Sequence, residues 1–197
     1  LGATAIKGAV AQAGVNPADV TDCLMGNVLQ AGQGQAPARQ AARGAGGPDR
    51  VPATTVGKVC GSGLQAVVLG ARAIMLGDAE VVIAGGMESM TRAPYLMPGA
   101  RAGLRMGHAQ IVDSMITDGL WDPYKDWHMG NAGELCAKEH SFSRETQDAF
   151  AIESYKRALA AQESGAFKGE IVPVVIEGKG ASTTVDSDEE PKRAKFD

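Results

Sequence analysis

The segment from Val51 to Gly85 restricts the fold more than any other part of the sequence. It reads as a strand, a glycine-rich turn, a helix and a second, continuously apolar strand over Glu80 to Gly85. The helix is indicated by apolar residues that recur at helical spacing, at Leu64, Val67, Val68, Ala71, Ile74 and Met75. A continuous apolar strand is typical of a parallel sheet that is covered on both faces. The segment therefore predicts a βαβ unit.

A similar alternation of helix and strand precedes this unit. The sequence predicts a helix over residues 3–13 that ends at Gly14, a strand over 22–29 and a second helix over 38–45. Alternating strands and helices joined by glycine turns indicate an α/β layered fold.

The pattern changes after Gly86. Residues 90–106 contain prolines, glycines, arginines and methionines without a clear period, which predicts a long excursion. Further along, Ser143 is a suitable N-cap for a long helix that ends near Ser164. Short strands are predicted over residues 171–176 and 182–185. The charged stretch from 186 to 197 is expected to contain no packed element.

Composition limits the classes of partner that the protein can bind and the kind of core that it can form. Lys plus Arg is 19 and Asp plus Glu is 23, so the formal charge is −4, which argues against nucleic acid as the main partner. Arg72, Asp78 and Glu80 interrupt the most apolar region, so we expect no membrane span and a soluble protein. Glycine accounts for 26 of 197 residues and aromatic residues for 5%, which predicts an aliphatic core with closely approaching backbones.

The three cysteines, Cys23, Cys60 and Cys136, lie far apart, and the three histidines show no zinc-ligand spacing. A disulfide scaffold and a structural metal site are therefore not expected. Free cysteines favour a reducing compartment. The expected location is the cytoplasm, with an organellar matrix as the alternative. Cys23 and Cys136 fall within a predicted strand and a predicted helix, where a buried structural thiol is the expectation.

Cys60 is the candidate nucleophile. It immediately precedes the predicted helix, where unpaired N–H groups and the helix dipole stabilise a thiolate. The glycines beside it allow backbone N–H groups to approach a substrate carbonyl oxygen, as an oxyanion hole requires. Such a thiolate can attack a thioester or ester and hold the acyl group covalently. A buried structural cysteine is the alternative on spacing alone.

The same turn formally matches a dinucleotide-binding motif, since Gly61, Gly63 and Ala66 follow the pattern GxGxxA. That motif also needs an acidic residue at the end of the next strand to bind ribose. Here the next strand ends in Ala84-Gly85-Gly86. A nucleotide-binding oxidoreductase is therefore only a distant alternative.

Five sequence blocks follow one another along the chain. The first runs from Val59 to Val67 (VCGSGLQAV). The others are 84–90 (AGGMESM), 118–122 (DGLWD) leading to 128–130 (HMG), 143–151 (SRETQDAFA), and 167–174 (FKGEIVPV) with Asp188-Glu189-Glu190. In this order the blocks resemble the thiolase family, and the first resembles its nucleophile segment. The His-Met-Gly triplet at 128–130 is closest to the acetyl-CoA acetyltransferases of that family.

The resemblance implies a layered α/β/α half with an inserted loop domain. The α/β core would span residues 1–90. The loop domain would span 91–197, with core elements returning within it, and would carry a tetramerisation loop at about 92–108. Relative to the family, the chain is expected to lack the opening strand and the C-terminal half, which supplies the remaining catalytic groups.

The resemblance also assigns the candidate site residues. Cys60 corresponds to the nucleophile that forms the acyl-thioester, and its backbone N–H to part of the oxyanion hole. Positions that contact coenzyme A in the family correspond here to Leu120, His128, Met129 and Arg193. Met106 corresponds to a position that borders the coenzyme A of another subunit across the tetramer contact. No metal and no covalently bound cofactor are expected.

Two functions from different classes follow. The first is a thiolase that condenses two acetyl-CoA to acetoacetyl-CoA and coenzyme A, or catalyses the reverse thiolysis, and associates as a dimer or tetramer. The fragment alone is expected to be inactive. The second is a non-catalytic half-thiolase that acts as a binding or assembly module. The reactivity of Cys60 distinguishes the two.

Overall fold

The computed structural model describes residues 1–195, so the last two residues of the expected loop domain lie outside the described residues. The chain divides into two compact units, Leu1–Met129 and Gly130–Asp197. The expected boundary at residue 90, between an α/β core and a loop domain, rests on the family resemblance and stays a prediction.

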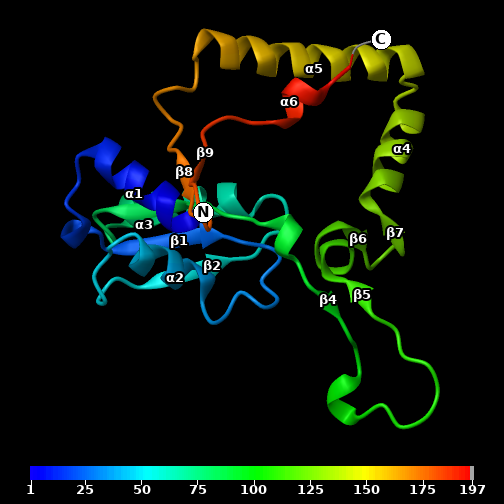
Figure 1. The fold of residues 1–197 in the computed structure, drawn as a ribbon, viewed down its shortest axis with the longest axis horizontal. Coiled ribbons are helices and arrows are strands. Elements are labelled where there is room, and N and C mark those ends of the chain that lie inside the picture. Colours follow the sequence, from blue (N-terminus) through cyan, green and yellow to red (C-terminus); the bar gives the residue numbers. More distant parts are fainter. Residues whose placement is uncertain (196–197) are drawn as a thin grey trace. The chain divides into compact units, whose positions relative to one another are not determined.

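The first unit begins with the α/β core that the sequence predicts (Figure 1). Its elements are α1 (Gly2–Ala13), η1 (Pro17–Asp19), β1 (Asp22–Gly26), α2 (Pro37–Gly44), β2 (Ala53–Val56), α3 (Ser62–Leu76) and β3 (Val82–Gly86). The three strands form one parallel sheet in the order β2-β1-β3. Parallel neighbours require crossover connections, and α2 and α3 provide them.

The central strand β1 shows why the sheet is covered on both faces. Cys23 and Met25 belong to a buried cluster with residues of α1 and α2, whereas Leu24 packs with Ala66 of α3. Because side chains alternate along a strand, β1 joins two separate cores. The result is the layered α/β/α arrangement that was expected.

Two details of this core differ from the sequence prediction. We expected β3 to be buried on both faces, but its residues are half-buried or exposed, because β3 is an edge strand of the described sheet. The predicted apolar face of α3 is also largely exposed: Leu64 is 71% and Met75 is 84% exposed. Instead α3 packs on the sheet through Ser62, Ala66 and Gly70. These small residues allow a close approach, and the larger aliphatic residues are left on the other side.

One segment, Val59–Leu76, is long and apolar enough to cross a membrane by length and composition alone, contrary to our expectation. The reason is that Arg72 is its only charged residue. The α-helix within it has 15 residues, about 22 Å in length, which is shorter than the ~30 Å hydrocarbon core of a bilayer. One side of that helix also packs on the sheet. The segment is therefore weak evidence for a membrane span.

The rest of the first unit is the predicted excursion. It comprises η2 (Met90–Arg92), β4 (Tyr95–Leu96), η3 (Ala100–Ala102), β5 (Val112–Asp113), η4 (Met115–Leu120), β6 (Trp121–Asp122) and β7 (Trp127–His128). Strand β4 pairs with β5 and β6 with β7, both antiparallel. Every residue from 97 to 111 is exposed in the loop that joins β4 to β5.

The second unit contains α4 (Met129–Glu139, which begins at the last residue of the first unit), α5 (Arg144–Ser164), β8 (Val174–Ile176), β9 (Thr183–Val185) and α6 (Glu190–Arg193). The predicted N-cap of α5 is confirmed, because the hydroxyl of Ser143 accepts a hydrogen bond from Thr146 N at 3.2 Å. The expectation of an unstructured charged tail is wrong. Residues 190–193 form α6, and Tyr155 of α5 donates a hydrogen bond to Glu190 at 3.2 Å.

Candidate active site

Cys60 lies in the tight turn between β2 and α3 and is exposed. The turn is closed by two backbone hydrogen bonds of 3.1 Å each, from Gly61 N to Lys58 O and from Ser62 N to Val59 O. Since Gly61 is the N-cap of α3, Cys60 is positioned just before the helix N-terminus, as the sequence predicts.

The turn is strained beside the cysteine. Val59 has φ +46°, a left-handed conformation that a β-branched residue rarely adopts. The buried hydroxyl of Ser62 donates to Val59 O at 2.6 Å and accepts from Lys58 N at 2.8 Å. Ser62 therefore holds both residues that precede Cys60. Strained backbone conformations of this kind are found most often at functional sites.

Three glycines bring the start of α3 against the ends of two strands. A Cβ on Gly26, at the end of β1, would lie 2.4 Å from Gly63 N. A Cβ on Gly86, at the end of β3, would lie 3.3 Å from Gly63 Cα. At position 26 only glycine allows this approach, and at position 86 a side chain would be in tight contact with α3. As a result, the turn that carries Cys60 lies at the carboxyl ends of the parallel strands, where open α/β sheets bind their ligands.

A cavity of about 430 Å³ opens beside Cys60. It is lined by the ends of β1 and β3, by the first residues of α3 and by η4, and it includes Asn27, Glu88 and Leu120. The volume falls within the ~300–1,000 Å³ typical of small-molecule sites. The cavity can therefore admit the reacting end of a substrate to the Cys60 sulfur.

Of the five residues assigned to coenzyme A, only Leu120 lines this cavity. His128 lies in β7, opposite Trp121 of β6, and Met129 begins α4 and is 41% exposed. Met106 is 94% exposed in the long loop. Arg193 belongs to the second unit, where it pairs with Glu189. The assignment of all five to coenzyme A stays a prediction.

Sequence reasoning missed two polar residues of the cavity, Asn27 and Glu88. Asn27 is 1% exposed and follows β1 directly, and Glu88 follows β3. Both positions could have been found from the rule that ligands bind beyond the carboxyl ends of parallel strands. Among residues 1–195, no group of three or more His, Cys, Asp and Glu side chains is arranged to hold a metal ion.

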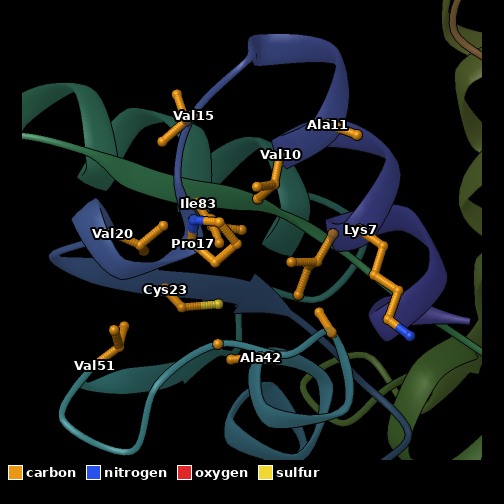
Figure 2. Close-up of a pocket in the computed structure, with 13 residues that line it drawn as sticks. Lys7, Val10, Ala11, Val15, Pro17, Val20, Cys23, Ala42, Val51 and Ile83 are labelled. Carbon is orange, nitrogen blue, oxygen red and sulfur yellow. The ribbon is translucent and has the colours of Figure 1, made fainter.

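Cys23 is a structural thiol, as expected. Its side chain is fully buried, and burial raises the pKa of the thiol to about 11, with a further contribution from the neighbouring Asp22 charge. Figure 2 shows Cys23 beside a second, apolar cavity of about 300 Å³, facing aliphatic residues of α1 and α2, while the Lys7 amine is directed away from it. Cys136, which we expected to be buried, is exposed on α4.

These differences predict an order of thiol labelling. At pH 7.5, iodoacetamide is expected to label Cys60 at least ~100-fold faster than Cys23, because Cys23 is inaccessible and its raised pKa keeps it protonated. Peptide mass spectrometry on a time course measures both rates, and Cys136→Ser removes the second exposed thiol as a competitor. Equal rates for Cys60 and Cys23 would contradict the exposure of Cys60 and the burial of Cys23.

Comparison with known proteins identifies the family of the chain. The family model described as "Thiolase, N-terminal domain" matches residues 1–197. An acetyl-CoA acetyltransferase of Cupriavidus necator is 56% identical over 190 residues, which cover 96% of this chain and 48% of that protein. Acetyl-CoA acetyltransferases of Pseudomonas aeruginosa and Schizosaccharomyces pombe are 54% and 53% identical and are covered to 49% and 50% of their length. The chain thus spans about half the length of these curated relatives, and it belongs to the thiolase family.

Proposed function

We propose that Cys60 is the nucleophile of an acetyl-CoA acetyltransferase. The Cys60 thiolate attacks the thioester carbonyl of acetyl-CoA, the bond to the coenzyme A sulfur breaks, and coenzyme A leaves as a thiol after taking up a proton. A second acetyl-CoA then loses an α-proton, and its carbanion attacks the acetyl-Cys60 thioester. A carbon–carbon bond forms, acetoacetyl-CoA is released and the Cys60 thiolate is regenerated. Thiolysis is the reverse sequence.

The observation that carries this proposal is the exposed Cys60 sulfur, fixed by a strained turn beside a cavity of about 430 Å³. The turn precedes the N-terminus of α3, where the helix dipole and unpaired N–H groups favour negative charge. We assign the Cys60 N–H to the oxyanion hole, because Gly61 N and Ser62 N already donate to carbonyls within the turn. The relatives' names supply acetyl-CoA as the substrate.

We propose that the remaining acid–base groups come from outside these 197 residues. The chain spans about half of its relatives, and α3 leaves an apolar face uncovered that includes Leu64, Val67, Ile74 and Met75. A surface of this kind in a natural protein is normally covered by another domain or subunit. The non-catalytic assembly module would present the same surface, but it gives no role to the strained, exposed Cys60. Family membership gives no support to the dinucleotide-binding alternative.

The direct test is mass spectrometry of the peptide that contains Cys60 after incubation of the full-length protein with acetyl-CoA. An acetyl group on Cys60 supports the proposal, and ping-pong kinetics should accompany it because the covalent intermediate separates the two half-reactions. If neither Cys60 nor any other residue is acetylated, the result would favour the non-catalytic assembly module.

Assembly gives a separate prediction. We propose a dimer formed through β2, the edge strand next to the Cys60 turn, and a tetramer formed through the exposed loop at residues 92–108.

Deleting the loop tip, Met97 to Gly103, is expected to convert tetramers to dimers. The alkylation rate of Cys60 should stay within about 2-fold of its value in the unsubstituted protein, since the loop tip does not line the cavity. Light scattering measures the first effect. The control shortens the exposed β8–β9 turn at Lys179-Gly180, and a tetramer that survives the loop deletion would contradict the assignment.

A further inference from the structure

The carboxylate of Glu88 joins two loops that lie about 60 residues apart in the sequence. Its Oε1 accepts hydrogen bonds from Asn27 Nδ2 at 2.9 Å and Leu29 N at 3.2 Å, and its Oε2 accepts one from Val28 N at 2.8 Å. All three donors belong to the loop after β1, whereas Glu88 belongs to the loop after β3. A carboxylate that accepts several N–H groups forms strong, directional bonds, so the two loops are held as one body.

Asn27 completes this connection from within the core. It is 1% exposed, and its Nδ2 donates to Met87 O at 3.1 Å as well as to Glu88. Because both partners are acceptors, the amide nitrogen must be on this side, which fixes the orientation of the side chain. Within the described part of the chain, the buried Oδ1 accepts no hydrogen bond. The side chain is therefore held through the nitrogen that faces the loop after β3.

The joined loops abut the start of α3. Gly26 immediately precedes Asn27, and a Cβ on Gly26 would lie 2.5 Å from Ser62 C and 2.4 Å from Gly63 N. On the other side, Met87 N donates to Gly26 O at 2.9 Å, and Gly86 lies against Gly63. Ser62 is the residue that ties down the Cys60 turn. A shift in either loop must therefore move the helix start and the turn, or open a gap between them.

We infer that Asn27 and Glu88 are positioning residues for the nucleophile. They fix the loops after β1 and β3 against α3, and this sets where the Cys60 sulfur meets a thioester carbonyl in the cavity. They touch neither the acyl group nor the reacting sulfur in this role. The inference rests on the proposed function of Cys60 and extends it to the groups that hold Cys60 in place.

The test replaces Glu88 with Gln in the full-length protein. An amide has only one acceptor oxygen, so its NH₂ group must face either Val28 N or the Asn27 and Leu29 donors, and one side of the junction is lost. A misplacement of about 1 Å can lower the rate of reaction ~10²-fold. Glu88→Gln is therefore expected to slow acetylation of Cys60 by acetyl-CoA ~10- to 100-fold, with the KM changed by less than about 3-fold.

Alkylation by iodoacetamide separates positioning from general damage to the fold. This small reagent needs an accessible thiolate but no aligned cavity, so its rate with Cys60 should stay within about 2-fold in the same variant. Gln33→Ala is the matched control, because Gln33 Nε2 donates to Leu29 O in the same loop without contacting Glu88 or lining the cavity. It should leave both rates unchanged.

Each outcome has a distinct meaning. If the unsubstituted protein is acetylated on Cys60 and Glu88→Gln is acetylated at the same rate, this inference is wrong while the proposed function stands. A parallel loss of acetylation and alkylation in a Glu88→Gln protein that is still folded by circular dichroism would show general damage to the Cys60 turn rather than misalignment, and would also overturn the inference. Absence of acetylation in the unsubstituted protein would overturn the proposed function itself. If Glu88→Gln does not fold, Asn27→Ala provides the same comparison, because it leaves the two backbone donors to Glu88 in place.

Discussion

Replacing Cys60 with serine in the full-length protein is expected to abolish formation of the acetyl-enzyme and to lower the rate of thiolysis more than ~10³-fold. The turn itself should survive, because Cys60 is exposed and the bonds that close the turn come from Gly61, Ser62 and Lys58. A serine hydroxyl at this site is a far poorer nucleophile than a thiolate. The loss should therefore be chemical rather than structural.

Two measurements check this expectation. Mass spectrometry after incubation with acetyl-CoA should find no acetyl group on residue 60, and the thermal unfolding temperature should match that of the unsubstituted protein. Cys136→Ser is the matched control, since Cys136 is the other exposed cysteine and lies on α4, away from the Cys60 turn in sequence. It should retain both acetylation and turnover. An acetyl adduct that persists in Cys60→Ser would exclude Cys60 as the nucleophile.

The parts of the fold that the sequence predicts well are those with local signals. The first helix ends at Gly14 and α3 ends at Gly77, and each of these glycines adopts the left-handed conformation of a helix C-cap. The N-cap of α5 is likewise a serine that bonds the first turn. The sequence predicts Cys60 as the candidate nucleophile for the same reason, because a few neighbouring residues show that it precedes a helix.

The parts that the sequence does not predict depend on distant contacts. Periodicity correctly identifies α3 as apolar, but it does not say which side of the helix packs on the sheet. That side is determined by the small residues Ala66 and Gly70, and a Cβ on Gly70 would lie 3.0 Å from Val82 Cγ1. Asn27 and Glu88 are a similar case. Asn27 lies in none of the motif blocks, and the block that contains Glu88 does not indicate what its carboxylate binds. Their connection appears only when two strand ends about 60 residues apart meet.

The isolated 197-residue chain is expected to be nearly inactive in thiolysis of acetoacetyl-CoA. Each general acid or base typically contributes ~10²–10⁴-fold to the rate, and the cavity beside Cys60 contains no histidine and no second cysteine among its lining residues. Glu88 is the only carboxylate in that lining, and it already accepts three hydrogen bonds. Among the described residues, no titratable side chain that lines this cavity is therefore free to activate the thiol or to protonate a leaving group. Steady-state thiolysis should fall below that of the full-length protein by at least ~10³-fold.

Loss of activity by unfolding must be distinguished from loss of the acid–base groups. The α3 face that includes Leu64 and Met75 would be exposed in the isolated chain, so aggregation is a second route to inactivity. The distinguishing experiment adds the C-terminal half of the full-length protein as a separate chain and measures both thiolysis and alkylation of Cys60. If the acid–base groups are what the isolated chain lacks, that chain should already be folded by circular dichroism. Adding the second half should then raise thiolysis by at least ~10²-fold, and alkylation of Cys60 should become faster as well, because an added base increases the thiolate fraction. Turnover by the isolated chain at the full-length rate would mean that residues 1–197 contain their own base. It would also remove the reason to expect that a catalytic domain covers the exposed face of α3.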